Sequence, residues 1–258
     1  MSPETPEFSP AALTALTRSQ LYALVAQAFA EPPATLTEWQ ARGRELDTVA
    51  EAAARLPASD SLRDSLAALH AASDRLAAEA DLADLRSTYL ELFGHLRAGP
   101  CPPYETEYAG QSEFVKNNDL ADLMGFYHAF GLDLAGGERP DYIGVELEFL
   151  HFLALKEAIA QQEERPDGAA VCIEAQKKFL CDHLGRWAGG FTTQLSKLGD
   201  DTFAFYRALG RLLATLVEWD SVRQGTNPQR IQTWTPGARG LERVSACGTG
   251  CSGKSCSP

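Results

Sequence analysis

ERPDYIGVELEFLHFL, residues Glu138–Leu153, is the stretch that decides the fold. Pro140 restricts the backbone just before Asp141, whose short carboxylate side chain is a preferred helix N-cap. Apolar side chains then recur at helical spacing, at Val145 and Phe149 among others. The stretch therefore predicts the start of a long helix with Asp141 as its N-cap.

Similar patterns on both sides of this stretch predict further helices. Ser9 followed by Pro10 is typical of an N-cap with proline at the first helical position. Proline or glycine follows the end of several apolar-periodic segments, where helices usually stop. Besides the helix that begins at 141, we expect helices over about residues 10–29, 36–56, 62–76, 82–93, 114–130, 169–187 and 201–219.

Composition supports an all-α fold. Leu and Ala number 33 and 39, whereas the β-branched residues Val and Ile number only 8 and 4. Straight-chain residues favour helices, and β-branched residues favour strands. We expect one all-helical domain over residues 1–220, built as a single bundle. Helical periodicity stops there, and glycines and prolines follow, so residues 221–258 are expected to be an irregular tail.

The charge and hydropathy of the chain limit its possible partners and its location. The formal net charge is −12, and no basic stripe of the kind that binds DNA or RNA is apparent. The first residues lack the positive and apolar regions of a secretory signal. No apolar run reaches the ~20 residues that span a bilayer. We therefore expect a cytoplasmic protein that binds no nucleic acid and does not insert into a membrane.

A proline-rich loop, GPCPPYETEY at Gly99–Tyr108, interrupts the helical pattern. Its three prolines disfavour helix and hold the segment extended. The loop thereby presents Tyr104, Glu105 and Tyr108 in set directions, which suits a binding surface. The alternative is a stiff connector between helices, with its tyrosines packed inward.

The start of the predicted long helix combines acidic and apolar side chains. Glu146 lies one helical turn after Tyr142, among apolar neighbours. Such a surface suits a basic peptide with a hydrophobic stretch, because ion pairing steers encounter and apolar burial supplies affinity. The alternative is an N-capped amphipathic helix whose acidic face is simply solvated.

Other chemistry has weaker support in the sequence. Cys247, Cys251 and Cys256 are three thiols within ten residues, and they would bind zinc or an iron–sulfur cluster if a fourth ligand came from elsewhere. A single E-x-x-H pattern, Glu148 and His151, lacks the second copy that di-iron bundles need. No nucleophile signature is present, so no catalytic activity is expected.

Three motifs resemble one known family: YLELFG at Tyr89–Gly94, CPPYETEY at Cys101–Tyr108, and ERPDYIGVELEFL at Glu138–Leu150. In this order they resemble the TorD/DmsD/NarJ family of redox-enzyme maturation chaperones. The proline loop is most similar to the chaperones of type II dimethyl sulfoxide reductase-group molybdoenzymes.

The resemblance implies an all-helical cytoplasmic chaperone of the TorD-like type that is not an enzyme. Its partner would be the apo catalytic subunit of a molybdenum oxidoreductase, or the twin-arginine signal peptide of that subunit. The chaperone would hold this client until molybdopterin guanine dinucleotide is inserted. No cofactor is expected to bind permanently, although this dinucleotide or a guanine nucleotide would bind transiently. The alternative is a metal- or cluster-binding accessory protein that uses the C-terminal cysteines.

The resemblance also implies which residues contact the client. Many relatives carry histidine where this chain has Tyr142, directly after the aspartate. The glycine-bearing linker at residues 135–140 would permit domain swapping, so a monomer and a swapped dimer are both expected forms. The expected client-binding residues are Tyr89, Leu92, Phe93, Pro103, Tyr104, Glu105, Tyr108, Glu138, Pro140, Asp141, Tyr142 and Glu146.

Overall fold

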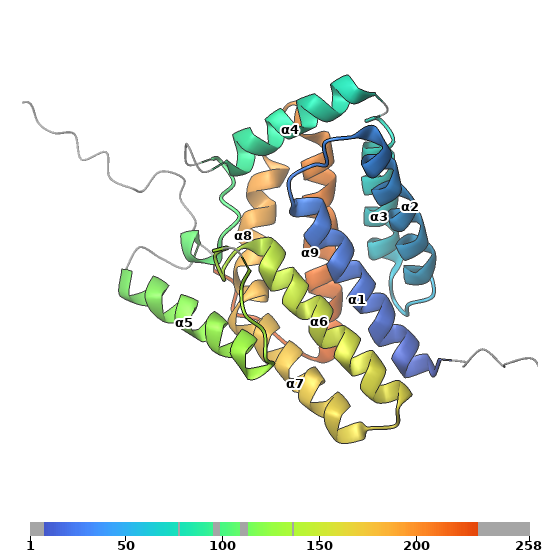
Figure 1. The fold of residues 1–258 in the computed structure, drawn as a ribbon, viewed down its shortest axis with the longest axis vertical. Coiled ribbons are helices and arrows are strands. Elements are labelled where there is room, and N and C mark those ends of the chain that lie inside the picture. The colour runs from blue at the N-terminus through green and yellow to red at the C-terminus, as the bar shows by residue number, and fades with distance from the viewer. Residues whose placement is uncertain (1–7, 77, 95–98, 109–112, 136, 232–258) are drawn as a thin grey trace, which may run out of the picture.

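The computed structural model describes residues 8–76, 78–94, 99–108, 113–135 and 137–231, and within them it is all-α (Figure 1). These residues form nine α-helices and two short 3-10 turns, with an isolated β-bridge and no strand. The all-α prediction is confirmed. The elements are α1 (Pro10–Phe29), α2 (Leu36–Ala53), α3 (Asp60–Ser73), α4 (Glu79–Phe93), η1 (Glu105–Glu107), α5 (Glu113–Ala129), α6 (Ile143–Gln162), α7 (Pro166–Asp182), α8 (Leu184–Ser196), η2 (Asp201–Phe203) and α9 (Ala204–Gln224).

Local signals account for several helix ends. The Ser9 hydroxyl accepts a hydrogen bond from the Ala12 amide at 3.1 Å, and Pro10 occupies the first turn, as predicted. The long helix starts later than predicted. It begins at Ile143, and the N-cap position belongs to Tyr142, which makes no side-chain capping bond. The expected capping role of Asp141 is therefore wrong, because its carboxylate bonds to a neighbouring loop.

The expected helix over residues 169–187 is also wrong, because the structure has two helices there. α7 ends at Asp182 and α8 begins at Leu184. Between them His183 has φ −127° and ψ −101°, which no helix can accommodate. Its ring is buried against the proline loop, so a tertiary contact overrides the local helical pattern.

α1 and α6 lie side by side in the centre of the bundle, with α9 behind them (Figure 1). α2 and α3 cover one flank, and α7 and α8 continue the other. α4 crosses one end of the bundle, where Phe93 packs against Phe29 of α1, Phe191 of α8 and Tyr206 of α9. One continuous apolar core includes side chains from all these helices.

A buried polar cluster, which we call the Arg18 cluster, joins four helices within this core. The Arg18 guanidinium donates to Glu157 at 2.9 Å, to Gln176 at 2.5 Å and to Asp220 at 2.7 and 2.8 Å. The Tyr22 hydroxyl donates to Asp220 at 2.7 Å. Buried charge is tolerated only when it is paired and hydrogen-bonded, and here each charged group is. The cluster fixes how α1, α6, α7 and α9 pack together.

α9 ends at Gln224, five residues beyond the expected end, where Gly225 adopts a left-handed φ of +66°. The following residues run back along α8, and the Ile231 amide donates to the Arg186 carbonyl at 2.9 Å. Cys247, Cys251 and Cys256 lie outside the described residues. Among the helices that are described, none combines the length and the apolar character needed to cross a membrane.

Candidate functional site

Two of the motifs that the sequence singles out are joined directly by backbone hydrogen bonds. The Glu105 amide donates to the Asp141 carbonyl at 3.0 Å, and the Ile143 amide donates to the Pro103 carbonyl at 2.9 Å. These bonds form an antiparallel bridge between Tyr104 and Tyr142. The proline loop is therefore tied to the start of α6.

A cavity of about 410 Å³ opens beside this bridge. We call it the tyrosine groove. Four chain segments contribute to it: the end of α1, α4, the proline loop and the turn before α6. Its lining residues are Ala30, Glu31, Tyr89, Phe93, Pro103, Tyr104, Gly137, Glu138, Arg139 and Tyr142. Six of the twelve residues expected to bind a client are thus brought together at one opening.

The walls of the tyrosine groove are aromatic and its rim is charged. The Tyr104 and Tyr142 rings lie 5.8 Å apart, and the Tyr89 and Phe93 rings lie 5.3 Å apart. The Tyr142 hydroxyl donates to the Phe29 carbonyl at 2.7 Å, which anchors that wall to α1. On the rim, Glu138 has no ion-pair partner among the described residues. The groove therefore offers apolar surface next to an unpaired carboxylate.

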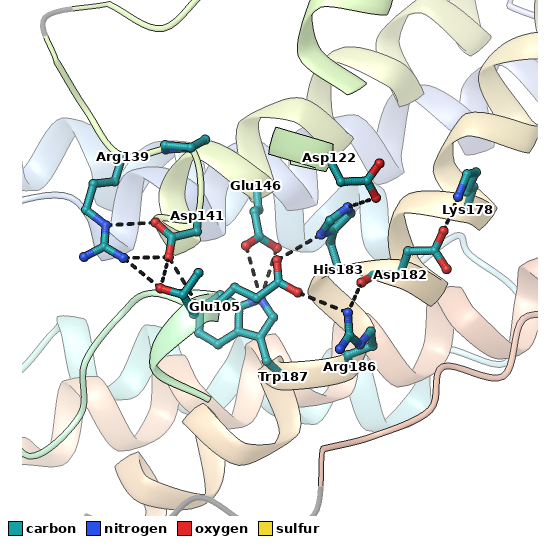
Figure 2. Close-up of polar contacts among 12 residues, drawn as sticks. Glu105, Asp122, Arg139, Asp141, Glu146, Lys178, Asp182, His183, Arg186 and Trp187 are labelled. Atoms are coloured by element: carbon teal, nitrogen blue, oxygen red, sulfur yellow. Dashed lines mark hydrogen bonds and ion pairs between the residues drawn. The ribbon is translucent and has the colours of Figure 1, made fainter. Parts of the chain in front are cut away.

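Asp141 lies behind this wall and has no exposed surface. Its carboxylate accepts from the Thr106 amide at 3.2 Å and the Thr106 hydroxyl at 2.7 Å. It also accepts from Arg139, through Nε at 2.9 Å and Nη2 at 2.8 Å (Figure 2). In this conformation Asp141 holds the proline loop and the turn before α6 together, rather than facing solvent.

Glu105 belongs to a second buried polar set. Its Oε2 is hydrogen-bonded to His183 Nδ1 at 2.9 Å, and Oε1 lies 3.8 Å from the Arg186 guanidinium (Figure 2). The other ring nitrogen of His183 lies 3.2 Å from Asp122 of α5. Burial raises the pKa of Glu105, and the contact with His183 opposes that rise.

Glu146 lies next to this set and is also fully buried. Both of its carboxylate oxygens accept from the Trp187 indole nitrogen, at 3.2 and 3.1 Å. Burial, together with the nearby Glu105 carboxylate, raises the pKa of Glu146 well above its ordinary value. His183, Arg186 and Trp187 were not predicted from the sequence as members of this set. Two buried glutamates need donors, but sequence spacing does not reveal which helix supplies them.

The remaining expected residues do not line the groove in this conformation. Buried side chains outside the groove lining present no surface to a partner in this conformation, so they support the groove from behind. Pro140 does not line the groove, and its carbonyl accepts from the Tyr127 hydroxyl at 2.7 Å. The buried members of the expected set are Leu92, Phe93, Pro103, Glu105, Tyr108, Asp141 and Glu146, and of these only Phe93 and Pro103 line the groove.

Two further features of the described residues bear on metal binding and on nucleophilic chemistry. The part of the chain that the structure describes contains no group of three or more His, Cys, Asp or Glu side chains placed to hold a metal ion. His151 of the E-x-x-H pattern instead contacts the Ser19 hydroxyl at 2.8 Å. Burial raises the pKa of the Cys101 thiol to about 12, so at neutral pH it is not a thiolate nucleophile.

A larger cavity of about 720 Å³ lies elsewhere, between α3, α8 and α9. We call it the α9 cavity. Its lining includes Ala58, Gly185, Gly189 and Val222, and it contains none of the residues singled out from the sequence. Size alone favours the α9 cavity, but the tyrosine groove combines aromatic walls with a charged rim and a bridge between two motifs. We therefore take the groove as the candidate site.

Comparisons with known proteins place these features in context. A family model for the nitrate reductase delta subunit matches residues 57–193. The chain is 34% identical over 150 residues to the chlorate reductase assembly chaperone protein of Ideonella dechloratans, covering 57% of this chain and 73% of that one. It is 33% identical over 128 residues to the selenate reductase assembly chaperone protein of Thauera selenatis, covering 48% and 63%.

A third relative is the chaperone protein TorD of Vibrio cholerae. It is 26% identical over 155 residues, which are 59% of this chain and 66% of the relative. The chain thus spans slightly less than two thirds of the length of the second and third relatives. The matched family region includes α4, the proline loop, α5 and α6, and hence most of the tyrosine groove.

Proposed function

The chain belongs to the nitrate reductase delta subunit family, the TorD/DmsD/NarJ group of redox-enzyme maturation chaperones, and on this premise we propose that it holds a molybdoenzyme subunit during assembly. Members of this family are assembly chaperones and not catalysts. The client would be the apo catalytic subunit of a type II dimethyl sulfoxide reductase-group enzyme. The chaperone would act in the cytoplasm and release its client after molybdopterin guanine dinucleotide has been inserted.

The observation that carries this proposal is the tyrosine groove. A twin-arginine signal peptide has two adjacent cations followed by an apolar segment. The groove offers apolar walls at Tyr89 and Phe93, and carboxylates at Glu138 and, just behind, Asp141. Apolar burial is worth about 25 cal/mol per Å², and rim charges mainly speed encounter. We therefore propose that this peptide binds in the groove, with its apolar segment against the aromatic walls.

A titration of the full chain with a synthetic peptide tests this proposal. The peptide carries an Arg-Arg pair followed by about 15 apolar residues, and calorimetry reports its affinity. We expect saturable binding, weakened by the roughly 2–5 kcal/mol that a flexible peptide loses when it becomes ordered on the protein. Tyr104→Ala should weaken binding by about tenfold, since one large aromatic contact is worth ~1.4 kcal/mol or more. A peptide with Gln-Gln in place of Arg-Arg should bind more weakly.

Val222→Ser is the matched control, because Val222 is 70% exposed and lines the α9 cavity instead. This variant should leave affinity unchanged. If Val222→Ser abolishes binding and Tyr104→Ala does not, the client site lies in the α9 cavity and the assignment to the groove is wrong. If no peptide or apo catalytic subunit binds the intact chain, the proposed function itself fails.

Transient contact with molybdopterin guanine dinucleotide or a guanine nucleotide is also part of the proposal. The phosphates of such a ligand do not suit the tyrosine groove, whose rim carries Glu31 and Glu138. A cavity of about 500 Å³ at the start of α9 fits better, because Arg75, Arg207 and Arg211 line it. Equilibrium dialysis with GTP tests this. Arg211→Ala should lower GTP binding, whereas an unchanged value would argue against the cavity.

The metal-binding alternative concerns Cys247, Cys251 and Cys256, outside the described residues, and it stays a prediction. Elemental analysis of anaerobically purified full-length protein tests it. Stoichiometric iron or zinc would favour that alternative. Whether the chain is a monomer or a domain-swapped dimer also stays a prediction, and light scattering coupled to size-exclusion chromatography measures it directly.

A further inference from the structure

Arg139 occupies a well-formed pocket at the edge of the tyrosine groove. Its guanidinium makes a two-point contact with the Asp141 carboxylate, Nε to Oδ1 at 2.9 Å and Nη2 to Oδ2 at 2.8 Å. Nη2 also donates to the Thr106 hydroxyl at 2.9 Å. The guanidinium carbon lies 4.2 Å from the centre of the Tyr104 ring. All three recognition elements for a planar cation are therefore present: a carboxylate fork, a hydroxyl acceptor and an aromatic face.

The receiving side of this pocket is built independently of Arg139. Asp141 and Thr106 are 0% and 2% exposed. The Thr106 amide and hydroxyl both donate to Asp141, and the Glu105 amide donates to the Asp141 carbonyl at 3.0 Å. These bonds hold the carboxylate in place whether or not a guanidinium is bound. The pocket is thus preorganised, which lowers the cost of binding a ligand there.

Arg139 itself comes from an exposed turn at the mouth of the groove. Its side chain is 44% exposed, although its charged end reaches a carboxylate with no exposure. The turn contains Gly137 at a φ of +81°, and the Arg139 carbonyl accepts from the Tyr142 amide at 3.2 Å. Arg139 and Asp141 are only two residues apart, so this contact is not needed to close a long loop. The Arg139 side chain therefore lies partly at the surface, while the Asp141 carboxylate that binds it is buried.

We propose that Tyr104, Thr106 and Asp141 form a guanidinium-binding pocket, that Arg139 fills it in the free protein, and that an arginine side chain of the client displaces Arg139. The displacement by a client rests on the proposed function, whereas the guanidinium pocket does not. Arg139 is then an internal competitor. Only molecules with an empty pocket can bind the client arginine, so the apparent affinity is the intrinsic affinity multiplied by the fraction of molecules in which the pocket is empty. The pocket also selects arginine over lysine, because a lysine side chain cannot form the same two-point contact with the Asp141 carboxylate.

The pocket is tested by emptying it in the full-length chain. In Arg139→Ala the Asp141 carboxylate loses its guanidinium partner but keeps its bonds to Thr106. N-acetyl-arginine amide, titrated into this variant, should bind and raise the midpoint of thermal unfolding in proportion to its concentration. N-acetyl-lysine amide and N-acetyl-citrulline amide should bind at least about tenfold more weakly, since they lack the charged fork. The wild type should also bind N-acetyl-arginine amide at least about tenfold more weakly than Arg139→Ala does.

Arg86→Ala is the matched control. It also removes an arginine from an ion pair at the groove, with Glu31 at 2.6 Å, but it leaves the guanidinium pocket filled. It should gain no affinity for N-acetyl-arginine amide. The second variant, Arg139→Ala combined with Asp141→Asn, should lose the binding gained by Arg139→Ala. A folded Arg139→Ala that does not bind N-acetyl-arginine amide would overturn the proposal. If Arg139→Ala unfolds, Arg139→Gln serves the same titration.

The Arg-Arg peptide separates this inference from the proposed function. If Arg139→Ala binds both the peptide and N-acetyl-arginine amide more tightly than the wild type, both ideas are supported. If it binds the amide but neither protein binds the peptide, the guanidinium pocket stands and the proposed function fails. If the wild type binds the peptide and Arg139→Ala gains affinity for neither ligand, the proposed function stands and Arg139 is only a structural ion pair.

Discussion

Arg18 and Asp220 are 202 positions apart in the chain, yet they form a two-point ion pair with no exposed surface, at 2.7 and 2.8 Å. The pair lies at the centre of the Arg18 cluster. Removing Arg18 would leave the Asp220 and Glu157 carboxylates buried without their cation. Arg18→Met should therefore lower the free energy of unfolding by about 3–5 kcal/mol, measured by urea denaturation.

The control for this prediction is an ion pair at the surface. Lys177 and Glu174 lie 2.7 Å apart, with the Glu174 side chain exposed and the Lys177 side chain partly exposed. Lys177→Ala should change the free energy of unfolding by less than about 1 kcal/mol, because solvent screens exposed pairs. A loss in Arg18→Met no larger than the loss in Lys177→Ala would mean that the Arg18 cluster does not hold the helices together.

The buried Glu146 carboxyl should make the stability of the protein depend on pH. Its pKa is raised in the folded protein, whereas in the unfolded chain it titrates near the ordinary value of 4.5. Above that pH the unfolded chain loses the proton while the folded protein keeps it, so stability falls as pH rises toward the folded pKa. Glu146→Gln, which cannot ionise, removes this loss. The variant should be more stable than the wild type at pH 8, and the advantage should vanish near pH 4.

The comparison between variant and wild type matters here, because Asp220 acts in the opposite direction. Burial raises the pKa of Asp220, but Arg18 outweighs burial and lowers it overall. Its contribution is present above the unfolded pKa and is lost as pH falls, equally in both proteins. Urea denaturation of both proteins at several pH values gives the difference. If the stability advantage of Glu146→Gln did not change with pH, the pKa of Glu146 would be the same in the folded and the unfolded protein, and the prediction would be wrong.

Replacing glycine by alanine at two positions in α8, Gly185 and Gly189, should change the stability of the protein in opposite directions. A methyl group on Gly185 would collide with Pro228 and with the Leu180 carbonyl, whereas nothing lies within 4 Å of one on Gly189. Gly189→Ala should stabilise the protein by about 0.5–1 kcal/mol, as expected in a helix interior. Gly185→Ala should destabilise it by about 1–3 kcal/mol through overpacking. Equal thermal midpoints would mean that residues 225–231 do not pack on α8.

Substitutions in α4 distinguish a core role from a groove role, because Leu92 lies in the core and Tyr89 lines the tyrosine groove. Both were expected to contact a client, but Leu92 is fully buried and Tyr89 lines the tyrosine groove. Leu92→Ala should cost about 2–5 kcal/mol of stability. Tyr89→Ala should weaken binding of the Arg-Arg peptide with a smaller loss of stability. If folded Leu92→Ala loses more affinity than Tyr89→Ala, the groove is not the contact surface.

The helices were largely predictable because caps, prolines and apolar spacing are local signals. Ser9 and Pro10 start α1 as their sequence indicates. The break at His183 was not predictable, since it depends on Glu105, 78 positions earlier in the chain. For the same reason the motifs identified the groove residues but not which of them are buried. Asp141 is typical of an exposed cap by sequence, and only its contacts with Thr106 and Arg139 place it inside.

The tyrosine groove is assembled from chain segments that are synthesised far apart in time. Ala30 and Tyr142, which both line it, are separated in the chain by α2 to α5, and its Phe93 wall is braced by Tyr206 of α9. A ribosome-bound fragment that stops before α9 lacks this brace. The groove therefore reaches its final shape only after α9 has been synthesised, so copies that still lack α9 compete poorly with complete ones for the same ligand.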